Sequence, residues 1–178
     1  RMGRFLTPFG RWNLIHADPL VWTTQRPLVT EFLAPLNVNG IMLQGTLPLG
    51  AGALEYSVYG EVVGDLHRSH GEVQFENTYG GRLAFSGPAE VGLSLLDFSE
   101  KVPGNPHYRM LGLDFVAGHD GWEASGEVFR RFHVGESNNS EDAGNGGYLQ
   151  GVAPLGGRWF AVGRLEALQS PEEGNIQR

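Results

Sequence analysis

The sequence of 178 residues has no cysteine, which excludes disulfide bonds, a thiol nucleophile and a thiolate metal site. Lysine is nearly absent as well, because only Lys101 stands beside twelve arginines. The net charge is -7, whereas a nucleic-acid-binding protein is expected to carry a surplus of basic residues. No stretch approaches the roughly 18 apolar residues of a membrane-spanning helix, although short alternating barrel strands stay compatible with this composition.

Motifs of catalysis are also missing. The sequence has no Gly-x-Ser-x-Gly elbow, no P-loop and no dinucleotide-binding fingerprint. Glu123 and Glu127 lie roughly 13 Å apart if they share a strand face, too far for most two-carboxylate chemistry. His67 and His70 could bind a metal, yet two histidines in a solvated loop are much commoner. We predict that the protein is not an enzyme and has no metal or cofactor.

Glycine, in contrast, is abundant, with 27 residues, about twice its usual share. Each glycine inside a helix costs about 1 kcal/mol relative to alanine, so this composition disfavours a helical protein. Tight turns containing Gly or Pro instead separate segments of alternating polarity, which predicts four β-hairpins. The predicted strand pairs are residues 39–47 with 53–62, 79–86 with 90–98, 108–117 with 122–132, and 147–153 with 158–167.

The connections between the hairpins are longer and polar, over residues 63–78, 99–107 and 133–146. Short turns that alternate with long loops are typical of outer-membrane barrels, whose turns face the periplasm and whose loops face the exterior. The strands alternate with period two, which predicts one apolar and one polar face. We expect an outward, lipid-facing set of Leu43, Val58, Leu83, Leu93, Leu113, Ala124, Ala161 and Leu165. Arg130 falls on this apolar face, where a residue near a strand end can snorkel to the interface.

Residues 1–38 do not follow this pattern. We expect a short first strand near Met2 to Leu6 and then a long irregular loop, rich in proline and tryptophan, of a kind that is usually functional or disordered. Its aromatic content argues against disorder. Two interpretations stay open: an inward-folded constriction loop that includes Trp12, Trp22 and Arg26, or an ordered external cap. Residues 39–168 form the four hairpins, and residues 169–178 are expected to be a polar loop.

The predicted fold is all-β, an antiparallel meander that forms part of a transmembrane β-barrel. One strand plus eight in hairpins makes nine, whereas bacterial single-chain barrels have even strand numbers. We therefore expect a segment of a larger barrel, closed by further strands from a longer chain or from other chains.

Several short phrases typical of barrel strands occur in order between residues 80 and 166. They are Gly80-Gly81-Arg82-Leu83, Gly112-Leu113-Asp114-Phe115, Gly121-Trp122-Glu123 with Gly126-Glu127-Val128, Gly147-Tyr148-Leu149-Gln150, and Arg164-Leu165-Glu166. In this order they resemble the later strands of bacterial porin-like outer-membrane proteins, particularly the phosphate-selective porin O/P-like group. The resemblance implies passive diffusion of small polar solutes, often through a trimer. Phosphate selectivity does not carry over, because one lysine and a net negative charge do not supply the basic cluster that it requires.

The leading functional hypothesis is a diffusion channel in the bacterial outer membrane, in contact with the lipid bilayer or lipopolysaccharide. The expected pore-lining residues are Glu55, Tyr59, Glu61, Arg82, Asp114, Glu123, Glu127, Arg131, Arg158, Arg164 and Glu166, with Gln44 also pointing inward. These charges would set the field for permeating ions, or they would form ion pairs that only satisfy inward positions. Two further hypotheses are a structural or docking barrel in a larger envelope assembly and a soluble β-sandwich that binds carbohydrate.

Overall fold

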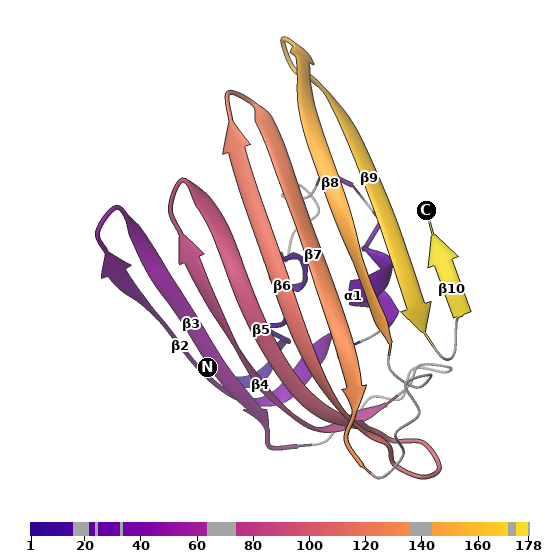
Figure 1. Ribbon diagram of the computed structural model, residues 1–178. Helices are drawn as coiled ribbons and strands as arrows, with labels where there is room; N and C mark the ends of the chain where they lie inside the picture. The colour runs from indigo at the N-terminus through magenta and orange to yellow at the C-terminus, as the bar shows by residue number, and fades with distance from the viewer. Residues whose placement is uncertain are drawn as a thin grey trace.

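A computed structural model describes residues 1–15, 22–23, 25–32, 34–63, 74–135, 144–170 and 174–177. Its strands form a single antiparallel sheet in which each strand pairs with its neighbours in the sequence (Figure 1). The elements are β1 (Met2–Leu6), the 3-10 helix η1 (Trp12–Leu14), α1 (Leu28–Phe32), β2 (Asn37–Leu49), β3 (Gly52–Glu61), β4 (Phe75–Ser86), β5 (Ala89–Glu100), β6 (His107–His119), β7 (Trp122–His133), β8 (Asn145–Gly156), β9 (Trp159–Ser170) and β10 (Gly174–Gln177). The predicted all-β antiparallel meander is confirmed.

The four predicted hairpins are also confirmed, with tighter turns and, except for β3, longer strands than the sequence pattern indicated. Between β6 and β7 the turn is Asp120-Gly121, whose φ values of 50° and 82° are both positive. A type I′ hairpin turn requires this geometry and favours Asp-Gly, because its twist matches that of the flanking strands. All four tight turns lie at one end of the sheet, and the strand ends that flank the longer connections lie at the other end (Figure 1).

The sheet is open along the described part of the chain. There β1 pairs with β2 and β10 pairs with β9, and neither edge strand has a partner on its other side. One prediction is corrected, because residues 169–178 are not simply a polar loop. Ser170 ends β9, and Gly174–Gln177 form β10 along its edge. Strand pairing uses backbone groups, so a polar sequence adds to a free edge as readily as an apolar one.

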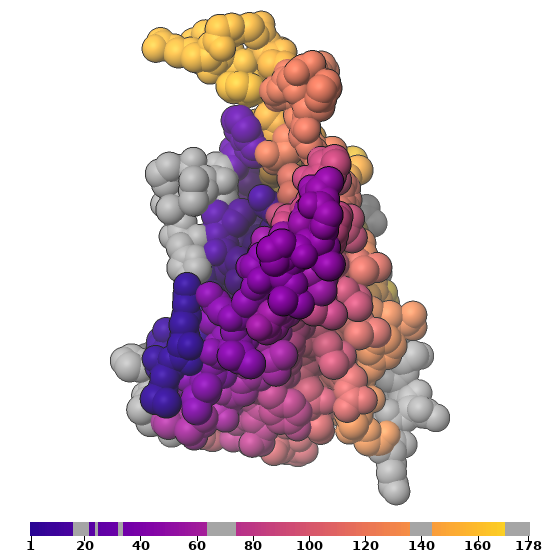
Figure 2. Space-filling model, turned by 90° about the vertical axis from the view of Figure 1, so that its left-hand side faces the viewer, coloured from indigo at the N-terminus to yellow at the C-terminus, as the bar shows by residue number. Residues whose placement is uncertain are grey.

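The two faces of the sheet have different surroundings. Residues 7–36, here called the inserted segment, connect β1 to β2. Their described part, which includes α1, packs against one face of the sheet, here called the inner face, where α1 contacts β8 and β9 (Figure 1). In the side view the indigo and violet N-terminal residues lie at the left and the orange strands at the right (Figure 2). The hydrophobic core sits between the inserted segment and the inner face, and includes Phe9, Trp12, Val29, Met110 and Phe129.

The opposite face, here called the outer face, is apolar and uncovered in the described structure. The eight side chains predicted to point outward all lie on this face and are exposed. Leu95 and Leu96 are two consecutive apolar residues, yet the strand register runs through them without a bulge. Leu95 points outward and is exposed, whereas Leu96 points inward and is fully buried, because the inner face here packs the core rather than polar groups. The predicted period-two pattern is therefore confirmed.

Candidate functional site: the charged inner face

The predicted pore-lining residues come together on the inner face because the cross-strand register aligns them. One row of directly opposed residues crosses seven strands in the order Glu55, Ala84, Gly92, Asp114, Glu127, Tyr148 and Glu166. Arg131, Glu123 and Arg164 occupy inner positions in neighbouring rows. Arg158 is the exception, because it lies in the turn between β8 and β9, where its guanidinium is 6.0 Å from the ring of Trp159.

Arg82 is the centre of an ion-pair network. Its Nη2 lies 2.5 Å from Asp114 Oδ1 and 3.1 Å from Glu90 Oε1, and its Nε donates to Asp114 Oδ2 at 3.2 Å. Arg11 of the inserted segment reaches Glu90 Oε2 at 3.6 Å. Gly92 allows this arrangement, because a Cβ at that position would collide with the side chains of Arg82 and Asp114. A bidentate pair of this kind fixes both side chains in orientation as well as in charge.

Two carboxylates of the row hold the inserted segment by its backbone. The N–H of Trp12 donates to Glu127 Oε1 at 2.5 Å, and the N–H of Leu28 donates to Glu166 Oε2 at 2.6 Å. Leu28 is the first residue of α1, whose leading N–H groups have no partner within the helix. Glu127 is only 2% exposed, so it lies beneath the segment and not against open solvent.

Arg164 completes these anchors on β9. Its Nε donates to Glu166 Oε1 at 2.8 Å, and its two terminal nitrogens donate to Thr23 Oγ1 at 2.6 Å and to the carbonyl of Gln25 at 2.8 Å. Trp22 lies beside Phe160, with 5.0 Å between the ring centroids. Residues of β7 and β9 therefore bind the inserted segment at several separate points.

Hydrogen bonds within the inserted segment also stabilise it. The N–H of Thr7 donates to the carbonyl of Leu36 at 3.0 Å, so the two ends of the segment meet. Asn13 donates to both of these residues' carbonyls, and Arg26 donates to Asn13 Oδ1 while stacking 5.3 Å from the ring of Trp12. The described residues of the inserted segment pack on the polar inner face, and whether they form a constriction loop or an external cap stays a prediction.

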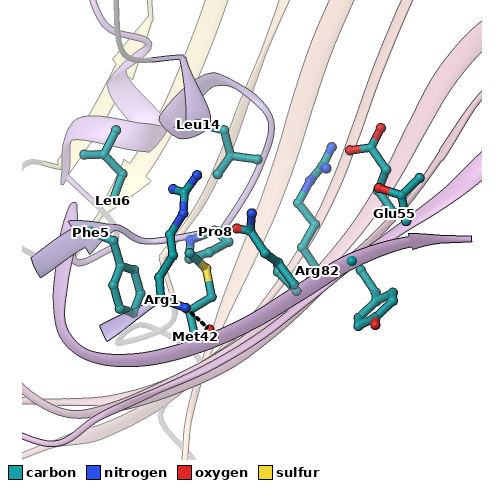
Figure 3. A pocket seen from close by; sticks show the side chains of 13 residues that line it. Arg1, Phe5, Leu6, Pro8, Leu14, Met42, Glu55 and Arg82 are labelled. Carbon is teal, nitrogen blue, oxygen red and sulfur yellow. Dashed lines mark hydrogen bonds between the residues drawn. The ribbon is translucent and has the colours of Figure 1, made fainter. Parts of the chain in front are cut away.

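A cavity of about 210 Å³ remains between the inserted segment and the inner face of β2–β4 (Figure 3). Its lining combines the charged side chains of Arg1, Glu55 and Arg82 with polar Gln44 and Ser57. Phe5 of β1 and Pro8 and Leu14 of the inserted segment close it from the opposite side. The cavity combines charged and polar side chains with apolar ones, as binding sites for small molecules do.

Two of the predicted pore-lining residues make contacts within the sheet and its core instead. Tyr59 is buried in the core with its ring 6.4 Å from that of Phe5. Glu61 accepts the N–H of Thr78 at 2.9 Å across the β3–β4 pair. Whether any residue of the set lines a pore stays a prediction.

Sequence reasoning missed several members of the inner face. Glu100 pairs with Arg131 at 2.7 Å, and Ser94 accepts the N–H of Gly10 at 3.1 Å. Both residues, like Glu90, occupy even positions of β5, so extending the period-two pattern along that strand would have found them. The partners of Ser94 and Glu90 on the inserted segment, Gly10 and Arg11, have no periodic signal and could not be found in this way.

No group of three or more His, Asp or Glu in the described residues could hold a metal ion. His67 and His70 lie outside the described residues. No helix in the described ranges is long and apolar enough to cross a membrane. Comparisons with protein-family models, curated proteins and solved structures find no match. The resemblance to porin-like proteins therefore stays a prediction.

Proposed function

We propose that this sheet is the membrane-embedded wall of a bacterial outer-membrane channel for passive diffusion of small polar solutes or ions. The outer face would contact lipid, and the inner face would border an aqueous passage. Further strands, supplied by a longer chain or by other copies in a trimer, would close the barrel. The single observation that carries the proposal is the continuous apolar outer face opposite a charged inner face.

The outer face has the composition that lipid requires. Its exposed side chains include Leu43, Leu83, Leu93, Leu113 and Leu165, and they form a contiguous surface across the strands. Soluble monomers rarely expose apolar patches larger than a few hundred Å². Aromatic residues lie toward both ends of the strands, with Trp122 and Trp159 beside the tight turns and Tyr79 and Phe132 toward the long connections. Outer-membrane barrels carry aromatic girdles in these two places.

Strand length supports the same proposal. Strands β2 to β9 contain 10 to 13 residues. The mean strand of a soluble protein has about 5–6 residues, whereas a tilted strand needs about 9–11 to cross a bilayer. The described strands also form one sheet, while a soluble sandwich needs two packed sheets.

The inserted segment would restrict the passage. It occupies the inner face of β5–β9, while the polar cavity over β2–β4 stays open. Charges of both signs line this remaining space, which favours small hydrated solutes over large or apolar ones. We therefore propose a narrow channel and not a wide porin.

A structural or docking barrel is the second candidate, and one observation favours it. Glu127, Glu166 and Arg164 are used to hold the inserted segment, so they are not free to act on a permeating solute. A barrel whose lumen is filled in this way would scaffold an envelope assembly without conducting.

Single-channel recording of the full-length protein in a planar bilayer distinguishes the two candidates. A channel gives discrete conductance steps, and these should increase when Glu166→Gln weakens the anchor of α1. A structural barrel inserts without steps, both as wild type and as Glu166→Gln. A protein that stays in solution without detergent would contradict both proposals and favour a soluble module.

A further inference from the structure

We infer that the outer face of β7–β9 carries a binding site for a lipid with an anionic phosphate headgroup. An acyl chain would lie in a groove over these strands, and Arg130 with Arg109 would hold the phosphate. The inference rests on the proposed function, because a lipid reaches this face only if the face lies in a membrane.

The groove has a volume of about 1250 Å³ and lies over β7, β8 and β9. Every exposed side chain in its lining belongs to the outer face. Small residues form its floor, because the register places Gly147 of β8 opposite Val128 of β7 and Ala167 of β9. In the adjacent row Leu149 and Leu165 stand opposite each other and are both exposed. The small residues, bordered by the larger side chains of Val128, Leu149 and Leu165, form an apolar groove that fits an extended acyl chain.

Polar residues cross one end of the groove. Arg130, Asn145 and Gln169 are directly opposed on β7, β8 and β9, and all three are exposed on the outer face. Asn145 Nδ2 donates to Gln169 Oε1 at 3.1 Å. This row lies at the end of the sheet that carries the long connections, so apolar and polar parts follow each other along the strands in the order of a lipid's chains and headgroup.

The arginines give this end a positive charge. Arg109 of β6 is opposite Phe132 and Leu111 is opposite Arg130, so the two arginines are diagonal neighbours with about 7–8 Å between their backbones. Asp97 offsets the charge of Arg109, because Oδ2 of Asp97 lies 3.0 Å from Nη2 of Arg109. Asp97 also contacts His107. Arg130 stacks 5.1 Å from the ring of Phe132 and has no carboxylate within ion-pair distance in the described structure. Arginine presents several N–H groups in a planar fork, which suits phosphate oxygens.

Charge decides the occupant of this surface. A second copy that docked here would bring Arg130 no unpaired carboxylate, because Asp97, the carboxylate beside Arg109 on the described outer face, is already paired with Arg109 and His107. An uncharged or zwitterionic lipid would leave the positive charge of Arg130 without a full counter-charge. An anionic lipid satisfies the groove and the arginine together.

Native mass spectrometry of the full chain, released from detergent micelles, tests the headgroup site. Phosphatidylglycerol and phosphatidylcholine with identical acyl chains serve as the probes. We expect the wild type to bind phosphatidylglycerol more tightly, and Arg130→Gln to lower that affinity about ten-fold, to the level of phosphatidylcholine. Arg158→Gln makes the same change in charge at the opposite end of the strands and should leave the preference unchanged. Equal affinity for the two lipids in the wild type, or an unaltered preference in Arg130→Gln, overturns the proposal.

A second pair of variants tests the groove. Ala167→Phe fills its floor and should weaken both lipids, whereas Ala161→Phe adds the same ring to an equally exposed outer position of β9 beyond the groove and should weaken neither. If both substitutions act alike, the acyl chain does not lie in this groove. Conductance is recorded on the same samples. Lost lipid selectivity with intact conductance refutes the lipid site alone, and selective lipid binding without conductance refutes the channel alone.

Discussion

The two faces of one sheet differ in a way that no soluble domain of this size requires. On β6, Asp114 points inward and is 2% exposed, while its neighbour Leu113 points outward and is 53% exposed. Charged groups are thus buried and paired beneath the inserted segment, and aliphatic groups are left uncovered. In water this arrangement would be unfavourable twice, since burial of charge and exposure of apolar surface both cost free energy. The comparison indicates that the surroundings of the outer face, lipid or water, distinguish a membrane protein from a soluble one, and that the surroundings of the inner face do not.

The ion-pair network of the inner face should give the largest effect. Arg82→Met leaves Asp114 buried without its bidentate partner, and removal of one member of a buried pair costs about 3–5 kcal/mol. Urea-induced unfolding in detergent measures the loss. Arg158→Met, at an exposed turn position, should change stability by less than about 0.5 kcal/mol. Similar unfolding midpoints for the two variants would show that the network does not stabilise the sheet.

The outer face should respond to charge by a slightly smaller amount. Leu113→Arg places a charge in the middle of the apolar surface, which costs about 2–4 kcal/mol at the midplane of a bilayer. The fraction of protein that inserts into lipid vesicles should fall accordingly, and Leu113→Met at the same position should insert normally. Normal insertion of Leu113→Arg would mean that this face does not contact lipid.

The anchors of the inserted segment link the two faces to function. Glu166→Gln keeps an acceptor for the N–H of Leu28 but removes the charge that strengthens this bond and pairs with Arg164. Amide hydrogen exchange at Leu28 should become about ten-fold faster. Glu123→Gln, on the same face, serves as the control and should leave this rate unchanged. An unchanged rate in Glu166→Gln would show that packing alone holds α1.

The smallest expected effect concerns permeation. Glu123→Gln removes a half-buried inner charge and should alter stability by less than about 0.5 kcal/mol. It should still shift the reversal potential in a salt gradient toward lower cation preference, because one negative charge leaves the proposed passage. Asp120→Asn makes the same change of charge in the exposed turn between β6 and β7. An equal shift for both variants would indicate a surface effect and not a pore wall.

Much of the fold could be predicted because it depends on local rules. The Asp120-Gly121 turn, the alternation of Leu113 with Asp114 and the grouping of Glu55, Arg82 and Glu127 on one face follow from turn chemistry and from a period of two. The charged partners of the inserted segment could not be predicted in this way. Trp12 and Glu127 are separated by 115 positions, and their contact joins a backbone N–H, which every residue except proline has, to a carboxylate.

The sequence by itself therefore determined the strands, their order and the side of the sheet on which each side chain lies, because these depend on neighbours in the chain. The tertiary structure alone decided that the inserted segment docks on the inner face, that Gly174–Gln177 form β10, and that the sheet is open in the described residues. These features depend on contacts between distant segments, through backbone groups that are nearly the same at every residue. The pattern of side chains along the sequence therefore does not predict such contacts.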